Sequence, residues 1–145
     1  MPAMDRPVSE VMRRDFVSLN RNDRLDFADE VMRFGRIRHL PVLDHGRVVG
    51  IVSNRDLLAA SLTRVLSFSR SQRDTFLHSV EVAEVMTKDV CCVLPETPLQ
   101  EAARLMLARK IGCLVVVGEG DRPVGLVTET DLLRAAYLRG EEPGG

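Results

Sequence analysis

The sequence is poor in the residues that mark disulfide-rich or zinc-binding proteins. It contains no tryptophan, one tyrosine and three cysteines, which are Cys91, Cys92 and Cys113. An odd number of cysteines without a Cys-x-x-Cys spacing argues against a disulfide framework and against a zinc site. Because Cys91 and Cys113 lie in apolar, strand-like runs, we expect both to be buried as small hydrophobic side chains.

Long apolar runs and an excess of charge of one sign are also missing. No stretch of about 18 apolar residues occurs, so no membrane-spanning helix is expected. The first residues lack the apolar core of a signal peptide. The formal net charge is −1, which gives no reason to expect nucleic acid or an anionic membrane as a partner. The sequence therefore predicts a cytoplasmic protein.

Signatures of catalysis and of metal binding do not occur either. The chain has no Gly-x-Ser-x-Gly sequence and no recognisable cysteine–histidine pair of a nucleophilic enzyme. Its histidines, His39, His45 and His78, have no metal-ligand spacing. We expect no enzymatic activity, no catalytic residue, no metal and no required cofactor.

What the chain does contain is an internal repeat, in which residues 8–58 return as residues 82–133. Several matched positions lie 74 residues apart: Val8 and Val82, Met12 and Met86, Leu25 and Leu99, Leu40 and Leu114. From Gly50 and Gly125 to Asp56 and Asp131 the separation is 75, which places a one-residue insertion in the turn before Gly125. Each copy, with about 50 residues, is marginal alone. We therefore expect two pseudo-symmetric copies packed together.

Each copy reads as β-α-β-β-α, which predicts an α+β fold. In the first copy the pattern predicts strands at residues 16–17, 37–43 and 48–52 and helices that begin at Asp23 and Ser53. In the second copy it predicts strands at residues 90–94, 113–117 and 124–127. Thr97 is the expected N-cap of the helix that joins the first two of these strands, and Pro98 is expected at the first position of that helix.

The predicted domain boundaries follow the repeat. The first copy is assigned residues 7–66, a helical connection residues 67–80, the second copy residues 81–138 and a disordered tail residues 139–145. The helix from Ser53 is expected to run past Leu66, with a turn near residues 67–71. Helices before the glycines are expected to stop near Gly35 and Gly112.

These features together resemble a CBS-domain pair, also called a Bateman module. The resemblance rests on Val-x-x-Val-Met at residues 8–12 and 82–86, and on the run from Ile37 to Val42 with its Asp44-His45-Gly46 turn. It rests also on Gly-hydrophobic-Val-Ser/Thr-x-x-Asp-Leu-Leu at residues 50–58 and 125–133. It covers nearly the whole chain, about residues 7–138.

The resemblance implies a regulatory module that binds an adenosine-containing ligand and does no chemistry. AMP, ADP, ATP and S-adenosylmethionine are the implied ligands, bound in clefts between the paired repeats. The implied ligand-binding residues include Ser53, Arg55, Asp56, Thr128, Asp131, Gly50 and Gly125. The resemblance also implies that adenine lies against backbone and apolar groups of strand residues, while core packing is the favoured interpretation for the apolar ones among them: Val17, Ser18, His39, Leu40, Pro41, Cys91, Cys92, Cys113 and Leu114.

The paired Ser53 and Asp56 suit such a ligand physically. They lie where a helix begins, and the free backbone N–H groups there attract phosphate. Two carboxylate oxygens of Asp56 match the two hydroxyls of a ribose. The same residues also match an ordinary capping box, in which the hydroxyl and the carboxylate satisfy the backbone. Both interpretations apply again to Thr128 and Asp131, and they are compatible.

Differences between the copies predict unequal sites. Arg55 corresponds to Thr130, and an arginine bonds phosphate about twice as strongly as a neutral donor does. Pro41 corresponds to Val115. We therefore expect the Ser53/Arg55/Asp56 site to bind a phosphorylated ligand more tightly than the Thr128/Asp131 site. Other arginines could assist a phosphate but are taken as surface charges: Arg13, Arg14, Arg36 and Arg38.

The resemblance also implies a stand-alone homodimer that forms a disc of four repeats and signals to an unidentified effector protein. The helices that carry Leu57, Leu58, Leu132 and Leu133 suit that interface. Two alternatives remain open. One is a ligand-free dimerisation or interaction scaffold, and the other is a detached regulatory subunit of an enzyme or transporter.

Overall fold

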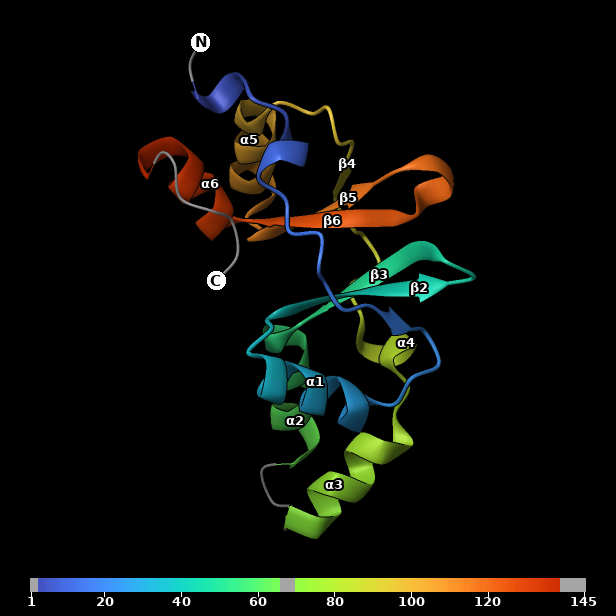
Figure 1. Cartoon of the computed structure of the whole chain (residues 1–145). Helices are drawn as coiled ribbons and strands as arrows, with labels where there is room; N and C mark the ends of the chain where they lie inside the picture. Colours follow the sequence, from blue (N-terminus) through green and yellow to red (C-terminus); the bar gives the residue numbers. More distant parts are fainter. Residues whose placement is uncertain (1–2, 66–69, 139–145) are drawn as a thin grey trace. The chain divides into compact units, whose positions relative to one another are not determined.

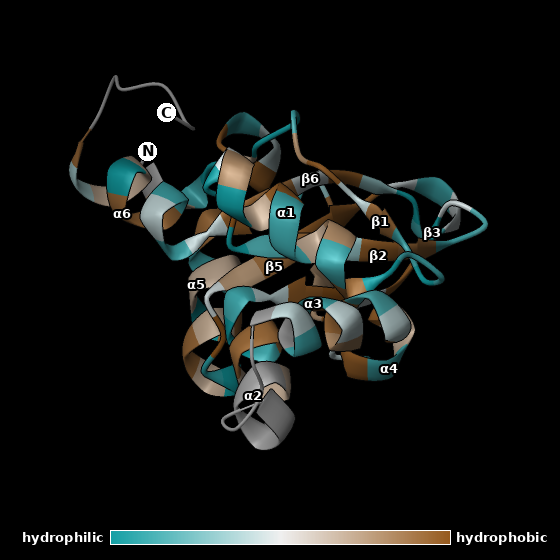
Figure 2. Ribbon diagram, turned by 90° about the horizontal axis from the view of Figure 1, so that it is seen from below, coloured by the Kyte–Doolittle hydropathy of each residue, from teal (hydrophilic) through white to brown (hydrophobic). Residues whose placement is uncertain are grey.

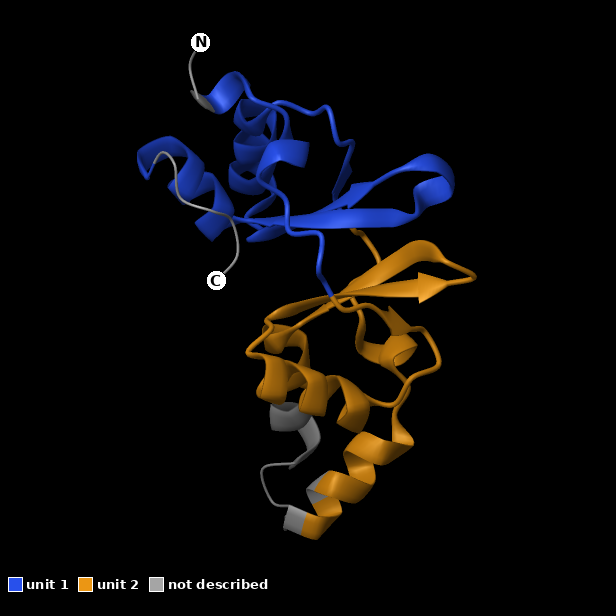
Figure 3. Ribbon diagram, viewed as in Figure 1, with its two compact units in different colours: residues 1–16, 91–145 blue, residues 17–90 orange. Residues whose placement is uncertain are grey.

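The computed structural model describes residues 3–65 and 70–138, which form two compact units (Figures 1 and 3). Unit 1 combines Met1–Phe16 with Cys91–Gly145, and unit 2 is Val17–Val90. Each unit therefore takes the sheet of one repeat and the opening segment of the other repeat. The expected α+β fold is confirmed.

Each unit is built on a three-stranded mixed sheet with the same topology. Unit 2 contains β1 (Leu19–Asn20), β2 (His39–Asp44) and β3 (Arg47–Ser53), with β1 parallel and β3 antiparallel to β2. Unit 1 repeats this order in β4 (Cys92–Val93), β5 (Cys113–Val117) and β6 (Pro123–Thr128). The register is also repeated, since Val42 lies opposite Gly50 and Val116 lies opposite Gly125. The two sheets are thus equivalent, as the repeat predicts.

The turns inside the two hairpins account for the change of offset. In unit 2, His45 (φ 53°) and Gly46 (φ 81°) form a two-residue connection with both residues left-handed, which is the geometry that hairpins favour. In unit 1 the connection is longer and contains a short 3₁₀ turn, η3 (Glu119–Asp121). The predicted insertion before Gly125 is confirmed and lies in this turn.

The first helix of each repeat packs on the core of its unit. These helices are α1 (Leu25–Gly35) and α5 (Leu99–Arg109), and each buries a leucine, an alanine and a methionine at helical spacing. Figure 2 shows α1 changing between hydrophilic and hydrophobic colour along its length. Both helices are followed by an αL residue, Arg36 or Lys110, so the stop predicted at Gly112 comes two residues late.

Three details of the sequence prediction are wrong by a few residues. The first strand is Leu19–Asn20 rather than residues 16–17, because Leu19 is the residue that pairs with Val42 and is buried. The N-cap of α5 is Pro98, with extended backbone, instead of Thr97. The Thr97 hydroxyl accepts the Leu94 N–H at 3.0 Å and closes the preceding turn. Asp23 likewise accepts the Asn20 N–H at 2.8 Å, while Arg24 is the N-cap of α1.

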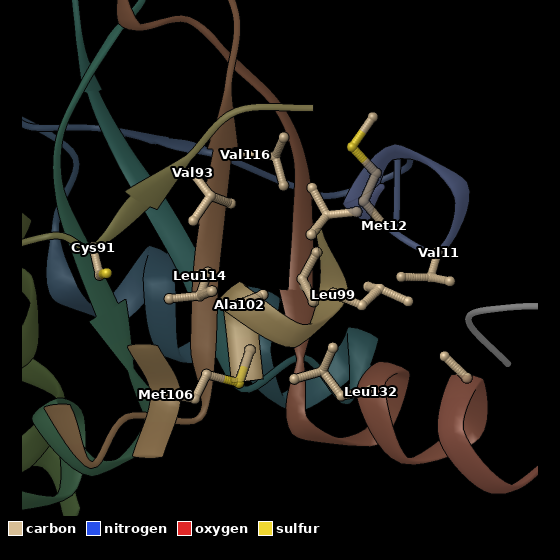
Figure 4. Packing of buried hydrophobic residues seen from close by; sticks show 13 residues of the cluster. Val11, Met12, Cys91, Val93, Leu99, Ala102, Met106, Leu114, Val116 and Leu132 are labelled. Carbon is tan, nitrogen blue, oxygen red and sulfur yellow. The ribbon is translucent and has the colours of Figure 1, made fainter. Parts of the chain in front are cut away.

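The core of unit 1 joins residues from distant parts of the chain. Figure 4 shows Val11 and Met12 gathered with residues of β4, α5, β5 and the last helix, α6 (Glu129–Tyr137). Unit 2 has an equivalent core, to which Val82 contributes from the opening segment of the second repeat. Because residues 8–12 and 82–86 complete the other repeat's core, neither repeat is a closed unit along the sequence.

Close packing against a glycine holds each opening segment on the sheet of the other repeat. The short helices η2 (Val8–Glu10) and α4 (Val82–Val85) precede Met12 and Met86, respectively. A Cβ added at Gly125 would lie 2.5 Å from Met12 Sδ, and one at Gly50 would lie 2.8 Å from Met86 Cγ. The glycines therefore leave the space that the methionine side chains occupy.

Helices α2 (Asn54–Val65) and α3 (Arg70–Ser79) connect the first hairpin to α4 in unit 2. Leu77 of α3 is buried in the core, and His78 Nδ1 lies 2.7 Å from Asp26 Oδ2 on α1. The predicted extension past Leu66, most of the turn at residues 67–71 and the tail lie outside the described residues. Among the described helices, none is long and apolar enough to cross a membrane.

Candidate functional site

The first candidate site lies in unit 2, where β3 ends and α2 begins. The Ser53 N–H donates to Asp56 Oδ2 at 2.8 Å, and the Asp56 N–H donates to Ser53 Oγ at 3.1 Å. The capping interpretation is therefore confirmed for this pair. The Thr87 hydroxyl, from the segment after α4, lies 3.4 Å from both Asp56 carboxylate oxygens. Asp56 is only partly buried.

The second candidate site is its counterpart in unit 1, where β6 ends and α6 begins. The Thr128 N–H donates to Asp131 Oδ2 at 2.9 Å, and the Asp131 N–H donates to Thr128 Oγ1 at 3.4 Å. The Thr128 hydroxyl also lies 3.0 Å from Asp131 Oδ2. Asp131 is 1% exposed and is the one buried charged residue in the described part of the chain.

Arg13 is the counter-ion of the buried Asp131. Its Nε lies 3.4 Å from Asp131 Oδ1, while the Arg13 side chain itself is 34% exposed. The Arg13 backbone exchanges two hydrogen bonds with Leu126 of β6, at 2.8 and 3.0 Å, which places the side chain beside the helix start. The sequence-based assignment of Arg13 as a surface charge is wrong, because the opening segment packs on the sheet of the other repeat.

The repeat offset is the signal by which the role of Arg13 could have been predicted. Arg13 and Thr87 lie 74 residues apart, at equivalent positions, and each contacts the carboxylate of one candidate site. Each site thus combines one arginine and one threonine, but at exchanged positions. Arg55 and Thr87 belong to the first site, whereas Thr130 and Arg13 belong to the second, with Arg55 and Thr130 both exposed.

The residues expected near adenine differ in position and in burial. His39 lies opposite Ser53, and Cys113 lies opposite Thr128, across the hairpin of each unit, so the structure brings these residues to the helix starts. Leu40 and Leu114 have no exposed surface, and they can offer a ligand only their backbone. The others divide by exposure: Pro41 and Cys91 are buried, and Val17, Ser18 and Cys92 are exposed.

Gly50 and Gly125 are buried against the opening segments rather than open toward solvent. The atoms that approach them belong to Met86 and the Thr87 carbonyl in unit 2, and to Met12 and the Arg13 carbonyl in unit 1. The close approach that a missing Cβ permits at these glycines is thus made by the chain itself. Their direct contact with a ligand stays a prediction.

Burial also sets the protonation of the cysteine beside the second site. Burial raises the pKa of the Cys113 thiol to about 12, and the Asp131 carboxylate adds to this rise while Arg13 opposes it. Partial burial, Asp121 and Cys91 raise the pKa of Cys92 as well. Cys91 and Cys113 are both buried, as expected. In residues 3–65 and 70–138, no three histidine, cysteine or acidic side chains gather where they could hold a metal ion.

The chain belongs to the CBS domain family. The family model for the CBS domain matches residues 8–63 and again residues 82–138, which together make up most of the chain. A CBS domain-containing protein of Dictyostelium discoideum is 31% identical over 127 residues, covering 87% of this chain and 88% of that protein. Other relatives are longer, and the chain spans 22% of inosine-5'-monophosphate dehydrogenase from Methanocaldococcus jannaschii.

Solved structures agree with this assignment. A candidate acetoin utilization protein (AcuB) from Vibrio cholerae has 36% identity and a TM-score of 0.72, with 90% of this chain and 89% of that chain covered. CBSX2, solved in complex with AMP, has 28% identity and a TM-score of 0.76, with 92% and 97% covered.

Two further relatives were solved with ligands of the same chemical class. The CBS domain pair of protein MJ0100, in complex with 5-methylthioadenosine and S-adenosyl-L-methionine, has 26% identity and a TM-score of 0.73, with 88% and 93% covered. The cytosolic domain of the Mg2+ channel MgtE, in complex with ATP, has 27% identity and a TM-score of 0.71, with 89% and 48% covered. These ligands share adenosine and differ in charge.

Proposed function

We propose that this CBS-domain pair is a sensor of adenosine-containing ligands such as AMP, ADP, ATP or S-adenosylmethionine. The observation that carries the proposal is the repeated Ser/Thr and Asp pair at two equivalent helix starts, Ser53 with Asp56 and Thr128 with Asp131. Relatives of the same fold hold ligands of this class. The bound ligand favours one conformation of the pair, and an effector protein responds to that population shift.

The geometry of the first site supports ligand binding most directly. One oxygen of Asp56 is held by the Ser53 N–H at 2.8 Å, which fixes the orientation of the carboxylate. A carboxylate has about four lone-pair positions, so Asp56 retains acceptors for two ribose hydroxyls. Arg55 is exposed one residue earlier on α2 and can pair with a phosphate near the N–H groups that begin the helix.

The first site is the stronger one in this proposal, for two reasons. Arg55 is exposed beside the site carboxylate, whereas its counterpart Thr130 has no charge to offer a phosphate. In addition, Asp131 is buried and paired with Arg13, so a ligand of the second site must first replace that interaction. At the first site the equivalent neighbour of Asp56 is the neutral Thr87 hydroxyl.

A thermal-shift panel tests the sensor function. AMP, ADP, ATP, S-adenosylmethionine, GTP and NADH are each added to the protein, and a ligand present at 100 times its Kd adds about 2.7 kcal/mol to the free energy of unfolding. We expect a shift from at least one adenosine-containing compound, and a smaller shift in Asp56→Ala. A matched control is Asp26→Ala, which removes a carboxylate of α1 that pairs with His78. No shift from any compound refutes the sensor function.

One observation favours a second candidate, a ligand-free interaction scaffold. Both site carboxylates already satisfy their own helix starts, and Asp131 is engaged by Thr128 and Arg13 as well. A pair of capping boxes needs no ligand to explain it. The same panel decides, because a scaffold shows no shift, and Asp56→Ala then changes stability alone.

We also propose that the module pairs with a second copy through equivalent helices. Leu57 and Leu132 are buried within their own units, but the next residues, Leu58 and Leu133, are 56% and 59% exposed. Each unit therefore exposes a leucine at the same position of its repeat, and a symmetric dimer buries equivalent apolar positions of this kind. Sedimentation analysis is expected to give the mass of a dimer for the unmodified chain and the mass of a monomer for the double variant Leu58→Ser/Leu133→Ser. Equal masses for the two proteins contradict this dimer interface.

A further inference from the structure

The two candidate sites differ in what covers the central carboxylate. Asp56 faces the neutral Thr87 hydroxyl at 3.4 Å and is partly exposed. Asp131 faces the Arg13 guanidinium at 3.4 Å, and its side chain has no exposed surface. Because Arg13 and Thr87 occupy equivalent positions of the repeat, the two sites differ at this position by an arginine in one and a threonine in the other.

Arg13 is held by its backbone, while its side chain has room to turn. The two hydrogen bonds with Leu126 fix the Arg13 backbone against β6, and Met12 is packed against Gly125 just before it. The guanidinium has five donors, and its contact with the carboxylate uses Nε at 3.4 Å. With 34% of the Arg13 side chain exposed, the guanidinium can turn to another anion without displacing the backbone.

We propose that Arg13 makes the Thr128/Asp131 site conditional on an anionic ligand. Arg13 covers the Asp131 carboxylate in this structure, and a phosphate group on the ligand draws the guanidinium away and leaves the carboxylate to the ribose hydroxyls. A neutral nucleoside has no group to pair with the displaced arginine, and a charge-assisted bond is lost without replacement. This inference rests on the proposed function, because it concerns the ligand class of one of its sites.

The same reasoning gives the first site a different selectivity. Thr87 carries no charge, so the approach of a ribose to Asp56 displaces a neutral hydrogen bond. Arg55 can add affinity for phosphate there, from its exposed position on α2. A nucleoside without phosphate therefore binds the first site more tightly than the second.

The test exchanges the two residues while one site is disabled. In an Asp56→Ala background, calorimetry measures adenosine and AMP binding at the second site with Arg13 and with Arg13→Thr. We expect Arg13→Thr to tighten adenosine binding by about tenfold and to bring the AMP-to-adenosine affinity ratio down by at least that factor. The reciprocal change, Thr87→Arg in an Asp131→Ala background, is expected to weaken adenosine binding at the first site.

Two further variants separate recognition from folding. Arg13→Lys keeps a positive charge and is expected to retain most of the AMP-to-adenosine ratio. Arg14→Thr removes the neighbouring exposed arginine, whose guanidinium bonds the Ser9 carbonyl at 3.1 Å, and should leave the ratio unchanged. Circular dichroism melts confirm that each variant is folded before binding is measured.

The outcomes distinguish the inference from the function on which it rests. If AMP binds the second site and Arg13→Thr leaves the AMP-to-adenosine ratio unchanged, the role of Arg13 is refuted while the site stands. If neither compound binds the second site in any variant while the first site binds AMP, the second site is not a nucleotide site and the inference is overturned with it. Absence of binding at both sites refutes the proposed function itself.

Discussion

Replacing Gly125 by alanine tests how tightly the opening segment is fixed to the sheet of unit 1. The new methyl would lie 2.5 Å from Met12 Sδ, 2.8 Å from Met12 Cγ and 3.1 Å from the Arg13 carbonyl oxygen. Met12 is nearly buried and can move only by disturbing the core. The Arg13 carbonyl is less free to move, because it accepts the Leu126 N–H at 3.0 Å.

The magnitude follows from two opposing effects. Overpacking of a filled core costs about 1–3 kcal/mol, and the loss of glycine flexibility in the unfolded chain returns about 0.4–1 kcal/mol. We therefore expect Gly125→Ala to lower the free energy of unfolding by about 1–2 kcal/mol. Urea unfolding followed by circular dichroism measures the loss.

A double variant supplies the control. Met12→Ala alone costs about 2–5 kcal/mol as a buried methionine truncation, and it also removes the side chain with which the new methyl group would collide. The two losses should therefore fall short of additivity by about 1 kcal/mol in the double variant. If Gly125→Ala is as stable as the unmodified chain, or if the losses simply add, the close packing of Met12 on Gly125 is refuted.

Three other predictions concern ionisable side chains. Burial raises the pKa of Cys113 to about 12 in the folded chain, above its value near 8.5 in an unfolded chain. Because only the unfolded chain loses the thiol proton between these values, the free energy of unfolding should fall from about pH 9 to pH 12, by up to about 1.4 kcal/mol per pH unit. Cys113→Ala should flatten this dependence in pH-dependent urea titrations, and equal slopes contradict the assignment. Cys92 is exposed but has a raised pKa, so its thiol should react slowly with a disulfide reagent at about pH 8. Asp121→Asn removes a charge that raises this pKa and should make the reaction faster. An unchanged rate contradicts the effect of Asp121 on the thiol. His78→Gln removes the contact with Asp26. Because the pair is exposed, the free energy of unfolding should fall by under about 1 kcal/mol, and amide exchange in α3 should become faster. Exchange that is not faster contradicts a stabilising role of this contact.

The repeat made most of the fold predictable. The order of strands and helices along the chain and the position of the insertion follow from matched apolar residues and from the change of offset at Gly50 and Gly125. The capping boxes were predictable too, because the Ser/Thr-x-x-Asp spacing has a local physical cause. Errors arose where non-local pairing decides, as at Leu19, which becomes the first strand because it meets Val42.

The exchange of opening segments could not be derived from the sequence. Both segments read Val-x-x-Val-Met, so either segment fits either sheet by composition, and only the three-dimensional structure shows which sheet each segment joins. This arrangement brings Arg13 to Asp131 across 118 residues. The most specific feature of the second site therefore depends on a contact that no local pattern records.

Calorimetry tests whether this CBS-domain pair senses an adenosine-containing ligand through Asp56 and Asp131. AMP, ATP and S-adenosylmethionine are titrated into the unmodified chain, Asp56→Ala, Asp131→Ala and the double variant. We expect saturable binding of at least one compound, a larger loss of affinity in Asp56→Ala than in Asp131→Ala, and no binding in the double variant. Binding that survives unchanged in the double variant, or that is absent from the unmodified chain, would contradict this expectation.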